Sequence, residues 1–163
     1  MTVWSTKLIK IDYLGHYSEF TPILAQWHQD EWCDISPDLS TSKRIDLYNS
    51  YKSEATIPSC LVAIADDKPS GSASLVFSDM DTHKNLTPWL ASVYVHKDYR
   101  CHGIASQLIQ ACIKNARKSG AKILYLFTPD QSDFYLKRGW RMLETAPYHG
   151  ERVDIMYYDL NSI

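Results

Sequence analysis

A strand, a helix and a second strand follow one another between residues 88 and 128, and this segment constrains the fold more than any other. Residues 88–95 (PWLASVYV) and 122–128 (KILYLFT) are apolar runs of strand length. The intervening residues 102–119 carry an apolar face at helical spacing, formed by Ile104, Ala105, Leu108, Ile109, Cys112, Ile113 and Ala116. Strands joined through a helix are expected to lie parallel with a right-handed crossover. The segment therefore predicts a βαβ unit within an α/β (α+β) fold.

The other predicted elements surround this unit. We expect a first strand at 5–12, helices at 18–32 and 40–53, two strands within 59–77, a short helix at 130–139, and two antiparallel strands around Gly150. No repeat, linker or low-complexity segment divides the chain. We therefore expect one domain over residues 1–163, which is long enough to bury a core.

Composition argues against several classes of protein. The formal net charge is −2 and the pI is about 6.3, so no global basic field favours a nucleic acid partner. The four cysteines form no CxxC pair and no histidine cluster has metal-ligand spacing, so we expect neither a disulfide framework nor a metal site. No apolar run reaches the roughly 18 residues of a membrane span, and the first residues lack a secretion signal. We expect a cytoplasmic protein without membrane contact.

The residues that open the predicted helix are unusual. The N-terminal end of a helix carries a partial positive charge and unpaired N–H groups, yet Arg100 and His102 lie there. Gly103 costs about 1 kcal/mol in a helix relative to Ala, but Gly103 and the small Ala105 let another molecule approach the backbone. This turn follows the carboxyl end of a parallel strand, where ligands of open α/β sheets gather. It predicts a phosphate-binding site, and a solvated basic loop is the alternative. Neither a P-loop nor a dinucleotide fingerprint is present.

Two motifs together resemble the GNAT superfamily of acyl-CoA-dependent N-acyltransferases. Residues 100–105 (RCHGIA) match the Q/R-x-x-G-x-G/A pyrophosphate loop of that family. Residues 134–140 (FYLKRGW) match its F-Y-x-x-x-G-F motif, with Trp140 in place of the last Phe. The predicted order of elements agrees over nearly the whole chain. The resemblance implies the GNAT fold, a single mixed central sheet of about seven strands flanked by about four helices, with the parallel βαβ unit at the cofactor site.

The resemblance also implies acetyl-CoA as co-substrate, without a metal. The backbone of Val93, Tyr94 and Val95 would pair with the pantetheine arm like an added strand. Thr128 stands where the family often has an Asn that contacts the cofactor. The pyrophosphate would be held by Arg100, Cys101, His102, Gly103, Ile104 and Ala105.

Tyr135 is the implied catalytic acid, and a core aromatic is the alternative interpretation. A thiol has a pKa of about 8.5 and tyrosine one of about 10, so proton donation to the thiolate is slightly uphill in water. Donation becomes useful only if Tyr135 is positioned at the sulfur as charge develops. A backbone N–H near Tyr94 or Val95 would polarise the thioester carbonyl.

The catalytic base is left open by the sequence. Many relatives carry a Glu on the fourth strand, but residues 90–92 read Leu-Ala-Ser. The candidates are Glu31, Asp81, His83, or water held by backbone carbonyls.

The acceptor side is less specific. We expect Glu31, Trp32 and Asp81 to bind the acceptor, because Trp32 precedes the loop that covers this site in relatives. Trp27, Trp89 and Trp140 either line the same channel or belong to the core. An acidic rim is expected if the segments after residue 30 and before residue 88 border the acceptor, formed by Glu31, Asp34, Asp38, Asp79 and Asp81. Such a rim favours a cationic or neutral amine over an acidic peptide, unless these are only solvated loop charges.

These observations predict an N-acetyltransferase. It would move an acetyl group from acetyl-CoA to a primary amine of a small molecule or peptide N-terminus, by direct attack in a ternary complex, as a monomer or homodimer. A non-catalytic acyl-CoA-binding sensor or scaffold is the first alternative, which the missing strand carboxylate favours. A phosphate-binding α/β protein unrelated to acetyl-CoA is the second.

Overall fold

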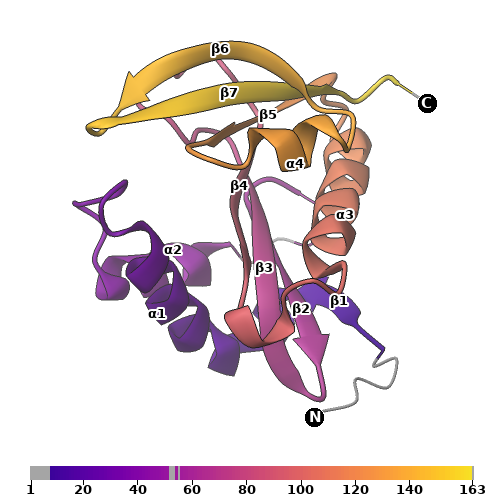
Figure 1. Ribbon diagram of the computed structural model, residues 1–163. Coiled ribbons are helices and arrows are strands. Elements are labelled where there is room, and N and C mark those ends of the chain that lie inside the picture. The colour runs from indigo at the N-terminus through magenta and orange to yellow at the C-terminus, as the bar shows by residue number, and fades with distance from the viewer. Residues whose placement is uncertain (1–7, 52–53, 55, 163) are drawn as a thin grey trace.

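The computed structural model describes residues 8–51, 54 and 56–162, which form one mixed sheet with helices on both faces (Figure 1). The strands are β1 (Lys10–Tyr13), β2 (Ser59–Ala65), β3 (Lys68–Val76), β4 (Trp89–Val95), β5 (Ile123–Thr128), β6 (Arg141–Tyr148) and β7 (Glu151–Asp159). The α-helices are α1 (Thr21–Trp32), α2 (Thr41–Ser50), α3 (Ile104–Lys118) and α4 (Ser132–Leu136). The strand order is β1-β2-β3-β4-β5-β7-β6, and β4 and β5 are the parallel pair. The predicted fold class is therefore confirmed.

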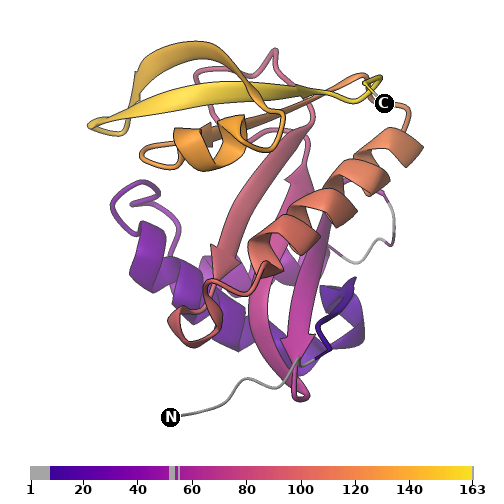
Figure 2. The same ribbon diagram turned by 45° about the vertical axis from the view of Figure 1, so that its right-hand side comes forward.

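The helices cover the two faces of the sheet in separate layers. Figures 1 and 2 show α3 on one face and α1 with α2 on the other. The apolar face of α3 packs on β2, β3 and β5 in the largest core cluster, which includes Leu108, Ile113 and Leu126. Leu24 of α1 and Tyr48 of α2 pack in a second cluster with Val62 of β2.

The ends of several elements differ from the sequence-based expectation. The helix expected at 18–32 begins at Thr21, because residues 18–20 form a separate 3-10 turn and a proline stands in the first turn of α1. The helix expected from 102 begins at Ile104, because Cys101 and Gly103 have φ angles of 67° and 77°, which are incompatible with an α-helix. Residues 5–7 of the first predicted strand and residues 52–53 of the second predicted helix lie outside the described residues.

The contact between β4 and β5 is confined to one end of these strands. Trp89 is in register with Tyr125, and the Tyr125 N–H donates to the Pro88 carbonyl at 3.0 Å. Along the rest of their described length the two strands do not pair. The β5-facing edge of β4 therefore leaves backbone N–H and C=O groups open toward its carboxyl end.

A β-bulge reshapes β4 just before that open edge. Ser74 is in register with Ala91 and Ser72 with Tyr94, so β4 has one extra residue here. Ser92 accordingly has a φ of 54°. On the neighbouring strand, a Cβ at Gly71 would lie 2.7 Å from the Tyr94 carbonyl oxygen, which explains a glycine there.

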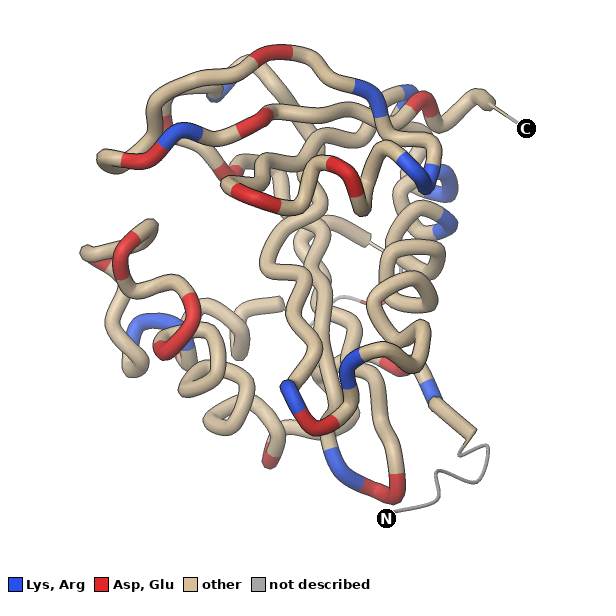
Figure 3. Tube along the Cα trace, viewed as in Figure 1, with Lys and Arg blue, Asp and Glu red and all other residues tan. Residues whose placement is uncertain are grey.

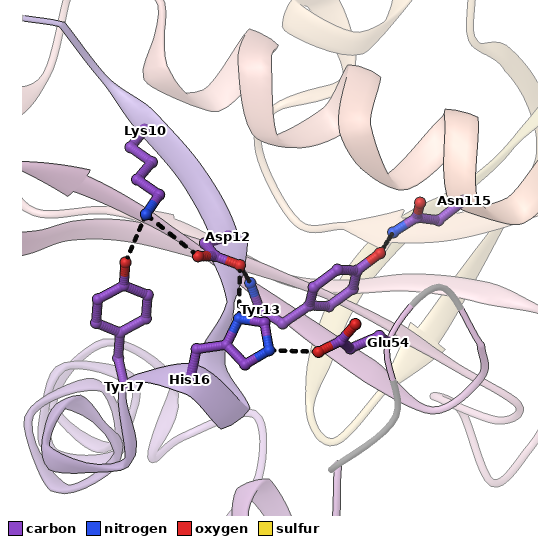
Figure 4. A network of polar contacts seen from close by, with 7 residues as sticks. All are labelled: Lys10, Asp12, Tyr13, His16, Tyr17, Glu54 and Asn115. Atoms are coloured by element: carbon purple, nitrogen blue, oxygen red, sulfur yellow. Dashed lines mark hydrogen bonds and ion pairs between the residues drawn. The ribbon is translucent and has the colours of Figure 1, made fainter.

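A polar network fastens the other edge of the sheet (Figure 4). Lys10 donates to the Tyr17 hydroxyl at 2.9 Å, and His16 lies between Asp12 and Glu54. The amide of Asn115 on α3 donates to the Tyr13 hydroxyl at 3.1 Å. These contacts join β1 to the segments that follow it and to α3.

Candidate active site

A cleft of about 1220 Å³ opens where β4 and β5 part. Its walls come from the carboxyl ends of both strands, the turn before α3, α4, the end of β3, and the segment running from the end of α1 through α2. Figure 2 shows α4 and the β6–β7 hairpin above α1 and α2. Val93, Tyr94 and Val95, at the open edge of β4, line the cleft.

The turn over residues 100–105 forms one end of the cleft. Arg100 donates from Nε to the Val95 carbonyl at 2.9 Å, and its guanidinium lies 5.8 Å from the centre of the Tyr94 ring. Arg100, Cys101, Gly103, Ile104 and Ala105 all line the cleft, whereas His102 is not among the lining residues. A Cβ on Gly103 would meet no atom within 4 Å, so the space beside this residue is open. The positive φ of Gly103, rather than crowding, is the reason for a glycine here. The first turn of α3 thus presents its N–H groups beside a cation.

Arg138 adds a second cation that sequence reasoning missed. It lines the cleft and donates to the Ser106 hydroxyl at 2.9 Å and to the Phe134 carbonyl at 2.8 Å. Its guanidinium lies 3.5 Å from the centre of the Phe134 ring, which fixes the side chain between α3 and α4. Its position within the FYLKRGW motif was the available signal.

Tyr135 of α4 lines the cleft and is only 8% exposed. Burial raises its pKa, and the nearby Cys112 raises it further, so the phenol keeps its proton at neutral pH. Thr128, at the end of β5, also lines the cleft. Its hydroxyl accepts the Gln131 N–H at 2.9 Å, which holds the turn between β5 and α4.

The candidate acceptor residues separate into two groups. Glu31 and Trp32 line the cleft. Asp81 is exposed and does not line it, and His83 is already paired with Glu144 on β6. Figure 3 shows acidic residues along the segment that follows α1.

Of the other tryptophans, none lines the cleft within the described residues. Trp89 and Trp140 are buried in the core. Trp27 packs against Tyr94 and His96, with ring centres 5.7 and 4.8 Å apart.

A buried polar group beneath the cleft was not foreseen from the sequence. His28 of α1 lies 2.7 Å from the Tyr48 hydroxyl through Nδ1 and 3.0 Å from the Ser72 hydroxyl through Nε2. Burial, and secondly the charge of Arg44, lower the pKa of His28 to about 3, so the imidazole is neutral. Burial raises the pKa of Tyr48 to about 12. Arg44, Tyr48 and Tyr51 line the cleft from one face of α2 and its end, at helical spacing that was visible in the sequence.

Asp79, from the loop after β3, lines the cleft together with Glu31 and Asp34 of the acidic rim. It is partly buried, and burial raises its pKa to about 7. Neither a hydrogen bond nor an ion pair to its carboxylate is present among the described residues.

In the described ranges, no three His, Cys, Asp or Glu side chains are placed to hold a metal ion. None of the helices that the structure describes has the length and apolar composition needed to cross a bilayer.

Known structures share this architecture. YncA of Salmonella typhimurium, solved with its cofactor acetyl-CoA, aligns over 95% of each chain with a TM-score of 0.72 at 14% identity. An aminoglycoside 6'-N-acetyltransferase complexed with coenzyme A aligns over 94% of this chain and 98% of its own, with a TM-score of 0.72 at 13% identity. The aminoglycoside 6'-N-acetyltransferase of Enterococcus faecium gives the same coverage, with a TM-score of 0.71 at 14% identity. No curated protein sequence matches the chain at a significant level.

The fold is the one that these acetyltransferases share. The model of the acetyltransferase (GNAT) family matches residues 22–140, and the chain belongs to that family. It is thus a GNAT N-acetyltransferase, an enzyme of the acyltransferase class.

Proposed function

We propose that this enzyme transfers an acetyl group from acetyl-CoA to a primary amine of a small molecule or peptide N-terminus, by direct attack in a ternary complex. The proposal rests mainly on the separation of β4 from β5. The gap lies between the basic turn that precedes α3 and the buried, protonated Tyr135. Both co-substrates would meet in this one cleft, so no acyl-enzyme is needed.

The cofactor half of the cleft suits CoA in shape and charge. The open edge at Val93–Val95 would pair with the amides of the pantetheine arm, as a strand is added to a sheet. The N–H groups of the 100–105 turn and the Arg100 guanidinium would hold the pyrophosphate. Arg138 is a further cation on the same wall. Thr128 accepts the Gln131 N–H and would donate its own O–H toward the cofactor.

The chemistry requires a neutral amine, a polarised carbonyl and a proton for the thiolate. The amine nitrogen attacks the thioester carbonyl carbon, and a backbone N–H of the bulged segment near Tyr94 or Val95 would stabilise the developing oxyanion. As the C–S bond breaks, Tyr135 would give its phenolic proton to the sulfur, and the proton that the attacking nitrogen loses would pass through water in the cleft to the tyrosinate. Its raised pKa keeps that proton in place until charge develops, so donation and bond breaking would be concerted.

The experiment is release of free CoA thiol from acetyl-CoA in the presence of a panel of amines, aminoglycosides and peptides with free N-termini. Turnover with any amine, with the acetylated product identified by mass spectrometry, is the expected result. Tight binding of CoA with no turnover across the panel would instead identify a sensor or scaffold module. No binding of CoA would contradict the proposal entirely.

A further inference from the structure

Tyr48 brings a hydroxyl group to the wall of the cleft that α2 forms. The side chain is 5% exposed and lines the cleft together with Ser92 and Tyr94 of β4. Its oxygen lies 2.7 Å from Nδ1 of His28, and the centre of the His28 ring lies 5.7 Å from that of Tyr94. The hydroxyl is therefore close to the bulged part of β4, where the thioester carbonyl would bind.

A buried chain of hydrogen bonds holds this hydroxyl from behind. Nε2 of His28 lies 3.0 Å from the hydroxyl of Ser72, and Ser72 is in register with Tyr94 across the bulge. His28 and Ser72 are each 1% exposed. Tyr48, His28 and Ser72 thus connect α2, α1 and β3 in one line of polar contacts that solvent does not reach.

The hydrogen-bonding capacity of His28 limits what the Tyr48 hydroxyl can do. The imidazole is neutral, so it has one N–H donor and one acceptor nitrogen, and the chain runs in a single direction. If Nε2–H donates to Ser72 and Tyr48 donates to Nδ1, the Tyr48 oxygen presents only lone pairs to the cleft. If the chain runs the other way, the Tyr48 O–H points to the cleft instead.

Arg44, one turn before Tyr48 on α2, makes this wall positive. It is 2% exposed, lines the cleft, and donates from Nε to the Gln29 side chain at 3.1 Å. Its Nη2 has no hydrogen-bond partner in the part of the chain that the structure describes. A cation so close disfavours an ammonium ion, so an amine beside Tyr48 is neutral. A neutral amine needs its lone pair for the carbonyl carbon, and it can therefore only donate N–H groups to the protein.

The strand beside the thioester offers no carboxylate to receive such an N–H. The residues of β4 that line the cleft are 90–95, with the sequence LASVYV. Among the described residues, the carboxylates that line the cleft are those of Glu31, Asp34, Asp79, Asp130 and Glu151. All of these are exposed except the partly buried Asp79. Tyr48 instead supplies a buried oxygen whose position is fixed by its neighbours.

We propose that the Tyr48 hydroxyl accepts an N–H of the reacting amine, and that His28 is the positioning residue that turns its lone pairs toward the cleft. This inference rests on the proposed function, because it places the thioester at the β4 bulge. The hydrogen bond directs the amine lone pair at the carbonyl carbon, and it strengthens as the nitrogen becomes positive during attack. Tyr48 itself takes no proton from the amine. Tyr48 and Tyr135 would thus act on the two partners of the reaction, one on the amine and the other on the sulfur.

The direction of the hydrogen-bond chain is measurable without any acceptor. The six histidines are labelled with ¹⁵N, the protein is saturated with CoA, and the His28 signals are assigned by their loss in His28→Asn. We expect the Nε2–H tautomer, with no proton on Nδ1, at both pH 6 and pH 8. The Nδ1–H tautomer overturns the inference, whether or not the enzyme acetylates any amine.

The kinetic test uses the amine of the panel that gives the highest kcat/KM, under conditions where chemistry limits turnover. Tyr48→Phe keeps the ring and should lower kcat by about tenfold or more, with the KM for acetyl-CoA within about twofold. The control Tyr13→Phe removes a hydroxyl that is bonded to Asn115 outside the cleft, and it should keep the wild-type kcat. An unchanged kcat in Tyr48→Phe overturns the inference.

Two variants of His28 separate positioning from packing. His28→Asn keeps a hydrogen-bond acceptor near the place of Nδ1 and should retain kcat within about threefold, whereas His28→Leu should lose as much as Tyr48→Phe. Adding His28→Leu to Tyr48→Phe should cause no further loss, because both changes remove the same hydrogen bond. Additive losses, or a tenfold loss in His28→Asn, overturn the role of His28. A wild-type enzyme that acetylates no amine contradicts the proposed function, while the tautomer separately decides the direction of the chain.

Discussion

Arg100 donates a hydrogen bond from Nε to the carbonyl oxygen of Val95 at 2.9 Å, and so joins the helix-opening turn to the open end of β4. One side chain thus orders both parts of the proposed cofactor site. A guanidinium has five N–H donors, and this bond uses one of them.

Replacing Arg100 by Gln should weaken CoA binding by about tenfold or more, because one charge-assisted contact to the pyrophosphate is lost. Isothermal titration with CoA measures this change. Lys97→Gln, in the preceding 3-10 turn, removes an equal charge and should leave the affinity within about twofold. Equal losses of CoA affinity in both variants would mean that Arg100 acts only through the overall positive charge of this region and not through a direct contact.

Gly103 and Gly120 form a matched pair at the two ends of α3. Their φ angles are 77° and 86°, and a Cβ at either would meet open space. Alanine at each should lower the free energy of unfolding by about 1–2 kcal/mol through left-handed strain. Only Gly103→Ala should also weaken CoA binding, because its Cβ enters the space proposed for the pyrophosphate. Urea unfolding and CoA titration of the two variants check this, and similar CoA affinities would place the pyrophosphate elsewhere.

Tyr135→Phe keeps the ring in the core and removes the acidic proton. We expect kcat to fall by about 10²-fold with little change in CoA affinity. Pre-steady-state measurements should first establish that chemistry limits turnover. If Tyr135→Phe then has the same kcat as the wild-type enzyme, Tyr135 is excluded as the general acid.

Asp79→Asn should stabilise the protein at high pH. The pKa of Asp79 is about 7 in the fold and near 3.8 when unfolded, so the folded state holds the proton more tightly. This carboxyl therefore destabilises the fold increasingly as pH rises from about 4 to 7. The variant should gain on the order of 1–3 kcal/mol at pH 8 and nothing near pH 3.5. Urea midpoints at both pH values measure the difference, and a variant less stable than wild type at pH 8 would contradict it.

His28 should make the fold sensitive to acid. Its pKa is about 3 in the fold against an ordinary value of 6.5, so the unfolded chain takes up the proton first. Stability is therefore fully present above pH 6.5 and decreases as the pH falls toward 3, by up to a few kcal/mol. His28→Gln should be less stable at pH 7 but lose less on acidification to pH 4. Parallel slopes for the two proteins would show that His28 is not the responsible group.

Local pattern was enough to predict much of this fold. The apolar face of α3 and the apolar runs on either side of it define the βαβ unit without any tertiary information. The basic turn over residues 100–105 and the FYLKRGW motif then indicated which end of that unit faces a ligand. The predicted helix boundary was wrong where local backbone conformation sets the end of the helix. Cys101 and Gly103 have left-handed φ angles, so α3 begins only at Ile104.

The acceptor half depended on long-range packing. Nothing near Asp79 in the sequence distinguishes it from Asp81, yet one enters the cleft wall and the other is exposed. Likewise, His28, Arg44 and Ser72 come together only because α1 packs on β3 and against α2. A single sequence carries no direct signal for such contacts.

A crystal structure of the enzyme with CoA would test the proposed cofactor site and the role of Tyr135 most directly. We expect the pyrophosphate against the N–H groups of residues 101–106, the pantetheine amides paired with Val93–Val95, and the sulfur within about 4 Å of the Tyr135 hydroxyl. CoA bound outside the opening between β4 and β5, or a sulfur remote from Tyr135, would contradict this expectation.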